Sequence, residues 1–175
     1  MRLRRSVIVS ILLAISYLSF SQSGSARIRE LYKYVEDIDS LADKSTKNFY
    51  LEKFLKDGYN YRETWRYLTN GERIIYFQID YILDSTEFTE VYYVKRNNLV
   101  CSEEYEKVNY SMREDELKWG GIYYFESSMP SHVVTLGRKN YYRRNMDPVM
   151  DAFARFGKRF SELKMHLPML PGEGE

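Results

Sequence analysis

Cysteine and histidine are scarce in this 175-residue chain, which carries only Cys101, His132 and His166. One cysteine cannot form an internal disulfide bond, so the hydrophobic core must hold the fold together. Neither histidine has a partner at the spacing of metal ligands, so the sequence predicts no metal site. The chain also lacks a glycine-rich phosphate loop and a G-x-S-x-G motif, so it indicates no cofactor and no catalytic residue.

Long apolar segments are missing apart from one uncharged run at residues 6–20. Three arginines precede this run and the small and polar residues SQSGSA follow it, which is typical of a cleavable secretory signal peptide. A membrane span needs about 20 apolar residues, so the run is short for an uncleaved anchor. We therefore expect residues 1–21 to be a signal peptide, cleaved after Ser21 or as late as Ala26. The mature protein is expected in a periplasm or outside the cell, without stable membrane insertion.

A positive surface that could hold nucleic acid is not indicated. Loss of the three N-terminal arginines lowers the basic residues from 26 to 23 against 25 acidic residues, a net charge of −2. Nucleic acid is therefore not an expected partner. The charge is uneven, because residues 101–126 hold seven acidic and three basic residues, whereas residues 137–167 hold eight basic and three acidic ones. We expect these segments to neutralise each other or to face water.

Aromatic residues are abundant, at 16% of the chain, and 17 of them are tyrosines. Tyrosine suits a β-sheet, because its ring packs while its hydroxyl reaches water. After residue 58, runs with strand-like alternation are separated by turn residues at 70–71, 97–98 and 129–130. Asn70-Gly71 is the strongest of these hairpin signals. Three successive hairpins predict an antiparallel meander of about six strands.

The second hairpin, residues 86–110, contains the chain's only cysteine. With a turn at Asn97-Asn98, Cys101 pairs with Val94 and shares a face with Leu99. That face is expected to be buried, which makes Cys101 an inert core thiol. The tyrosines of this hairpin are expected to pack, and most of its acidic residues are expected to face solvent.

Two helices are expected to flank the strands. The first places Ile28, Leu31, Val35, Ile38 and Leu41 at helical spacing. The last can be capped by Asp147 and begin at Pro148, with apolar residues every three or four positions: Met146, Val149, Phe153, Phe156, Phe160, Leu163 and Leu167. Residues 47–57 fit either a helix or a strand. Together these patterns predict one α+β domain at residues 27–167, with the meander packed against the C-terminal helix and an N-terminal helix, and a disordered tail at 168–175.

The runs EVYYVKRNNLV and GGIYYFESSMPSHV resemble the repeated "YYF, turn, K-L-I" units of small exported proteins from Bacteroidetes-type bacteria. In those proteins a helix and a "GY, strand, N-G-K-L" hairpin precede the meander, as GYNYRETWRYLTNGERI does here. The resemblance covers residues 58–137 and departs from the pattern at residues 128–131, where the polar turn and lysine are missing. It implies the meander fold and no activity.

The best candidate binding surface is aromatic. Pairing about the first hairpin turn sets Trp65 opposite Tyr76, with Tyr67 on the same face. If the helices cover the face that carries Ile75, Phe77 and Ile79, these three aromatic residues form an exposed patch that could contact a sugar or a protein. Alternatively, they stabilise the sheet through cross-strand pairs or lie under the first helix. The sequence thus predicts an exported, non-enzymatic binding protein whose protein or glycan partner is unknown.

Two other functions are compatible with the sequence. An envelope immunity or inhibitor protein could block a toxin or hydrolase through the acidic segment 101–126. A hydrolase would need two convergent acidic residues in a deep cleft. Glu103 and Glu104 cannot act together, because consecutive strand residues point to opposite faces. The hydrolase is the least favoured of the three functions.

Overall fold

The fold is a seven-stranded antiparallel meander with a helix on each face. The computed structural model describes residues 26–55, 58–108, 110, 116–126, 129–137 and 148–169. An N-terminal helix spans residues 26–45. The other elements are β1 (Lys47–Phe54), β2 (Asn60–Asn70), β3 (Arg73–Leu83), β4 (Thr86–Lys95), β5 (Asn98–Val108), β6 (Glu116–Glu126), β7 (Met129–Gly137), α2 (Pro148–His166) and a 3-10 helix (Leu167–Met169). The α+β prediction is confirmed, with seven strands rather than six.

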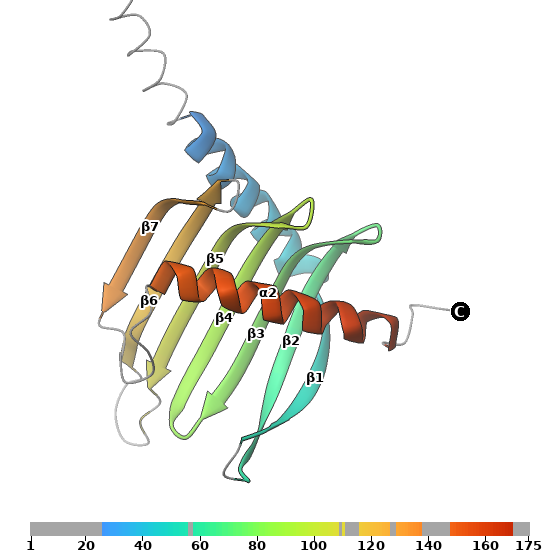
Figure 1. Ribbon diagram of the computed structural model, residues 1–175, viewed down its shortest axis with the longest axis vertical. Coiled ribbons are helices and arrows are strands. Elements are labelled where there is room, and N and C mark those ends of the chain that lie inside the picture. The colour runs from blue at the N-terminus through green and yellow to red at the C-terminus, as the bar shows by residue number, and fades with distance from the viewer. Residues whose placement is uncertain are drawn as a thin grey trace, which may run out of the picture.

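Each strand pairs with the next one along the chain, so the sheet order is β1 to β7. The ambiguous segment 47–57 supplies β1, an edge strand that pairs with β2 from Lys47↔Tyr67 to Phe54↔Asn60. Strand β7 forms the other edge (Figure 1). Helix α2 crosses the strands on one face, and the N-terminal helix lies behind the sheet. No helix among the described residues is long and apolar enough to cross a membrane.

Two hydrophobic clusters occupy the two faces of the sheet. The α2 face buries Trp65, Phe77, Tyr92 and Tyr123 against Phe156, Phe160 and Leu163 of α2, among others. The phenylalanine stripe predicted for the last helix therefore packs on the sheet. The opposite face, here called the back face, buries Tyr76, Val91, Tyr93, Cys101 and Tyr124 against Val35 and Ile38 of the N-terminal helix.

All three predicted turns are displaced. The β2–β3 turn lies at Gly71-Glu72 rather than Asn70-Gly71, because Asn70 still belongs to β2 and pairs with Arg73. The β4–β5 turn lies at Arg96-Asn97, both with positive φ, and Asn98 already belongs to β5. Met129 and Pro130 are not a turn but begin β7, where an edge strand can accept a proline because its missing N–H is not needed by a second neighbour. The signal peptide, Asp147 and the tail beyond residue 169 lie outside the described residues.

Cys101 is fully buried, as predicted, but its pairing was predicted wrongly. It lies opposite Tyr93 on the back face, whereas Val94 pairs with Leu99 and faces α2. A register shift between Tyr93 and Val94 separates the two pairs, because a bulge adds a residue to one strand. Burial raises the pKa of the Cys101 thiol well above its usual range, so the thiolate is disfavoured.

Candidate functional site

The predicted exposed aromatic patch is absent from the described structure. Trp65, Tyr67 and Tyr76 are 0%, 7% and 6% exposed, respectively. Trp65 and Tyr67 lie under α2, and Tyr76 lies on the back face under the N-terminal helix. The prediction that the three residues form one accessible surface is therefore wrong. A ligand role for them stays a prediction.

A bulge in the first hairpin explains the error. The register shifts between Leu68 and Thr69, so that Trp65 pairs with Ile79 and Tyr67 pairs with Phe77. A shift of one residue moves every following side chain to the other face of the partner strand. Pairing counted outward from Asn70-Gly71 thus assigned Tyr76 to the wrong face.

The sheet carries a buried charged layer beneath α2 that sequence analysis did not identify. Glu63, Glu90 and Glu104 come from β2, β4 and β5 and are 0%, 3% and 5% exposed. The guanidinium group of Arg159 donates to Glu63 over 2.8 Å and to Glu90 over 3.1 Å. Arg155 forms ion pairs with Glu104 and, over 3.7 Å, with Glu90. Two arginines on successive turns of α2 therefore face three buried carboxylates.

Hydroxyl and indole groups complete the bonding of these carboxylates. Tyr81 and Tyr92 donate to Glu90 over 3.0 and 2.8 Å, and the indole N–H of Trp65 donates to Glu63 over 3.0 Å. Burial alone would raise the pKa of Glu90, but Arg159 and Arg155 together hold it below its usual value. Glu90 is therefore a bonded anion, whereas a general acid requires a raised pKa. This arrangement attaches α2 to the sheet.

The acidic residues of β5 point inward more than the sequence suggested. Glu103 and Glu104 do lie on opposite faces, as alternation predicts. Glu104 faces Arg155, while Glu103 accepts hydrogen bonds from Tyr93 and Tyr105 over 3.3 and 2.6 Å. The expectation that most acids of this hairpin face solvent fails for the buried Glu90 and Glu104. Burial of Glu104 leaves less of the acidic segment 101–126 available as an inhibitor contact.

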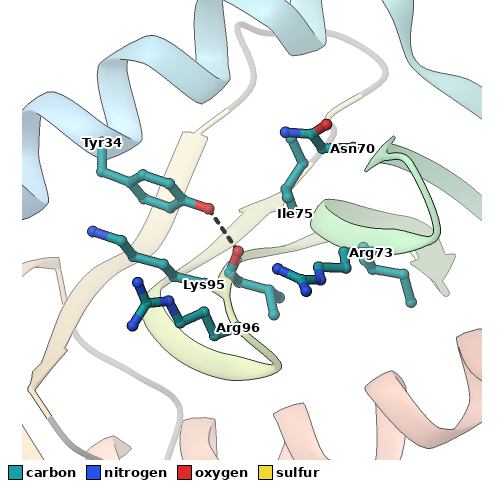
Figure 2. A pocket seen from close by; sticks show the side chains of 8 residues that line it. Tyr34, Asn70, Arg73, Ile75, Lys95 and Arg96 are labelled. Atoms are coloured by element: carbon teal, nitrogen blue, oxygen red, sulfur yellow. Dashed lines mark hydrogen bonds between the residues drawn. The ribbon is translucent and has the colours of Figure 1, made fainter.

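An open pocket lies on the back of the sheet, where two hairpin turns approach the N-terminal helix (Figure 2). Its volume is about 270 Å³. The lining residues are Tyr34, Asn70, Arg73, Ile74, Ile75, Val94, Lys95 and Arg96, and we call it the hairpin pocket. The hydroxyl of Tyr34 donates to the carbonyl oxygen of Val94 over 2.6 Å, which fixes the helix against the β4–β5 hairpin. Three of the eight lining residues are basic and none is acidic.

The three cations of the hairpin pocket have different surroundings. Lys95 pairs with Glu30 over 3.2 Å and lies 5.2 Å from the ring centre of Tyr34. Arg73 and Arg96 are exposed, and neither has an acidic partner among the residues that the structure describes. In Figure 2, Arg73 extends from the β2–β3 hairpin toward the turn that carries Arg96. The pocket therefore presents two arginines, from different hairpins, that have no acidic partner within the described part of the chain.

The backbone of Arg96 adopts a conformation that is unusual for arginine. Its φ is +55°, in the left-handed region that costs a residue with a side chain roughly 1–2 kcal/mol. Glycine or asparagine is the usual choice at such a turn position. Strained residues of this kind concentrate at functional sites. The signal was present in the sequence as KRNN between two strands, but the arginine could be placed only once the turn was shifted by one residue.

The histidines do not contribute to a metal centre in the described part of the chain. His132 lies 6.1 Å from the ring of Tyr124, and His166 lies 6.0 Å from that of Phe49. No group of three or more His, Cys, Asp or Glu side chains among the described residues is arranged to hold a metal ion.

Comparison with known protein families, with characterised proteins and with solved structures finds no match for this chain.

Proposed function

We propose that the chain is an exported, non-enzymatic binding protein whose hairpin pocket receives carboxylate groups of an acidic segment of a partner protein. The observation that supports this function is the presence of Arg73 and Arg96, without described acidic partners, at the mouth of one open pocket. Arginine suits the role because its planar fork matches a carboxylate with two parallel hydrogen bonds. Residues 1–21 and the resemblance to small exported proteins support export.

An acidic protein segment fits the pocket better than a glycan does. Sugar recognition commonly uses an exposed aromatic ring as a platform. Trp65 and Trp119 are 0% and 5% exposed, and the ring of Tyr34 is already covered by Lys95. The part-exposed Ile75 in the pocket wall can instead contact the aliphatic stem of a glutamate side chain.

Titration of the purified protein with a capped hexaglutamate peptide tests this function. We expect the Nε–Hε NMR signals of Arg73 and Arg96 to shift, and the affinity to fall with added salt, because exposed ion pairs are screened. Arg73→Gln should weaken binding about tenfold, which corresponds to the loss of one charge-assisted contact. Lys158→Gln, on the exposed surface of α2, is the matched control and should bind like the wild type.

Arg96→Asn separates binding from folding. Asparagine tolerates the left-handed backbone, so this variant should be at least as stable as the wild type while losing affinity for the peptide. Binding of oligogalacturonate in place of hexaglutamate would assign a glycan partner. Equal affinity of the peptide for Arg73→Gln, Arg96→Asn and wild type would overturn the role of the pocket.

A further inference from the structure

Strand β7 is an edge of the sheet that no other described strand covers. All nine of its residues are exposed, including Val133, Val134 and Leu136 at 41%, 47% and 65%. It pairs with β6 on one side, and no strand among the described residues pairs with it on the other. The outer backbone N–H and C=O groups of an edge strand are a template for another strand. Its sequence, MPSHVVTLG, contains no Asp, Glu, Lys or Arg.

Strand β1, at the opposite edge of the sheet, differs from β7 because it carries charged side chains. Strand β1 carries Lys47, Glu52 and Lys53 within eight residues. Charged side chains on an edge strand are a common protection against pairing with other chains, because a new neighbour would have to desolvate them. Lys53 is also engaged with Glu63 and Glu162 beneath α2. Among the described residues, the same sheet therefore carries charged side chains on one edge strand and none on the other.

We propose that β7 pairs with β7 of a second copy of this chain, in antiparallel orientation, to form a two-fold symmetric dimer. The two seven-stranded sheets would join into one sheet of fourteen strands, with both α2 helices on the same side. Pairing of β7 with the charged β1 edge would instead be head to tail and would leave free edges for further copies. The charges on β1 disfavour that open assembly, whereas self-pairing of β7 closes after two copies.

The composition of β7 suits its own antiparallel partner. Pairing along the whole strand places Val133, the central residue of Met129–Gly137, opposite its own copy. His132 then lies opposite Val134, and Ser131 lies opposite Thr135. No like charges meet at any position, which matters because directly opposed like charges destabilise a strand pair. β-branched residues at the centre are those that favour strand pairing.

Sedimentation velocity of the purified protein over a range of micromolar concentrations tests the dimer. We expect a concentration-dependent shift from monomer to dimer. Val133→Lys places two ammonium groups against each other at the two-fold axis and should weaken dimerisation about tenfold or more. Phe54→Lys, at the 78%-exposed end of β1, is the control and should leave dimerisation unchanged. Circular dichroism of both variants checks that the fold is retained.

Disulfide trapping tests the register independently of any loss of stability. Val133→Cys should form an intermolecular disulfide across the two-fold axis on mild oxidation, while the buried Cys101 stays reduced. Phe54→Cys should not form one at the same concentration. A wild type that stays monomeric throughout overturns the proposal. So does a dimer that forms the disulfide through Phe54→Cys and survives Val133→Lys, because it would use the β1 edge.

Discussion

At the scale of single residues, Arg159 is the group on which the attachment of α2 most depends. Its guanidinium bonds to Glu63 of β2 and Glu90 of β4, and it lies 5.7 Å from the ring centre of Trp65. Two carboxylates that are 0% and 3% exposed share this one cation. Desolvation of charged groups is costly, so a buried pair stabilises a fold only when its bonds are complete. Removal of Arg159 would leave Glu90 with the 3.7 Å contact to Arg155 and Glu63 with the 3.8 Å contact to Lys53, so the compensation of both anions would be much weaker.

Arg159→Leu is therefore expected to lower the free energy of unfolding by about 3–5 kcal/mol, the usual cost of breaking a buried ion pair. Arg62→Leu is the matched control, because Arg62 pairs with Glu52 over 2.8 Å at the exposed edge of the sheet. An exposed pair contributes about 0–1 kcal/mol. Urea unfolding followed by circular dichroism measures both losses. Similar losses for the two variants would show that the buried layer does not hold α2.

At the scale of elements, the sequence predicted best where the pattern is local. The spacing of Phe153, Phe156 and Phe160 predicted a helix that packs on the sheet, because helical periodicity depends only on neighbouring turns. The number of strands was nearly correct for the same reason. The faces of the strands were not, because bulges next to Thr69 and Val94 shift the register and leave no clear mark in the sequence. The charged layer beneath α2 depends on which side chains share a strand face, so it could not be predicted from the sequence.

Two glycines in different elements should respond oppositely to alanine. Gly157 lies within α2 with nothing within 4 Å of an added Cβ, so Gly157→Ala should stabilise the protein by about 0.5–1 kcal/mol. Gly137 ends β7 at φ +80°, and an added Cβ would collide with the carbonyl oxygen of Lys118. Gly137→Ala should therefore destabilise the protein by about 1–3 kcal/mol. Thermal unfolding of both variants measures the two shifts. Stabilisation by Gly137→Ala would contradict the described end of β7, and destabilisation by Gly157→Ala would contradict the free space beside α2.

At the scale of the whole molecule, the predicted signal peptide determines at which residue the mature protein begins. Expression of the full sequence in a bacterium with a general secretion pathway should yield a protein whose N-terminus is Gln22 if cleavage follows Ser21, or Arg27 if cleavage follows Ala26. Intact-mass spectrometry of the periplasmic and cytoplasmic fractions distinguishes these products. An uncleaved chain retained in the membrane would contradict export with cleavage.

The two helices are also attached to the sheet by groups with opposite pH dependence. On the α2 face, arginines hold the pKa of Glu90 below its usual value. On the back face, burial raises the pKa of Glu103 and of Asp39, the N-terminal helix residue to which Tyr93 donates over 2.6 Å. A carboxyl with a lowered folded pKa loses its contribution as the pH falls through that pKa. One with a raised folded pKa gains as the pH falls from neutrality, because the protonated form is the one that burial favours.

The free energy of unfolding should therefore rise as the pH is lowered from 7 toward the raised pKa values of Asp39 and Glu103, and fall at more acid pH, where Glu90 is protonated. Glu103→Gln removes one buried charge and keeps an acceptor for Tyr105, so it should raise stability at pH 7 by roughly 1 kcal/mol or less and flatten the rise. Glu90→Gln should instead lower stability at pH 7 and weaken the acid-side loss. Urea unfolding of the three proteins at several pH values checks both signs. Stability that is greatest at pH 7 and unchanged in slope by Glu103→Gln would contradict a raised pKa of Glu103, because a raised pKa requires the opposite trend.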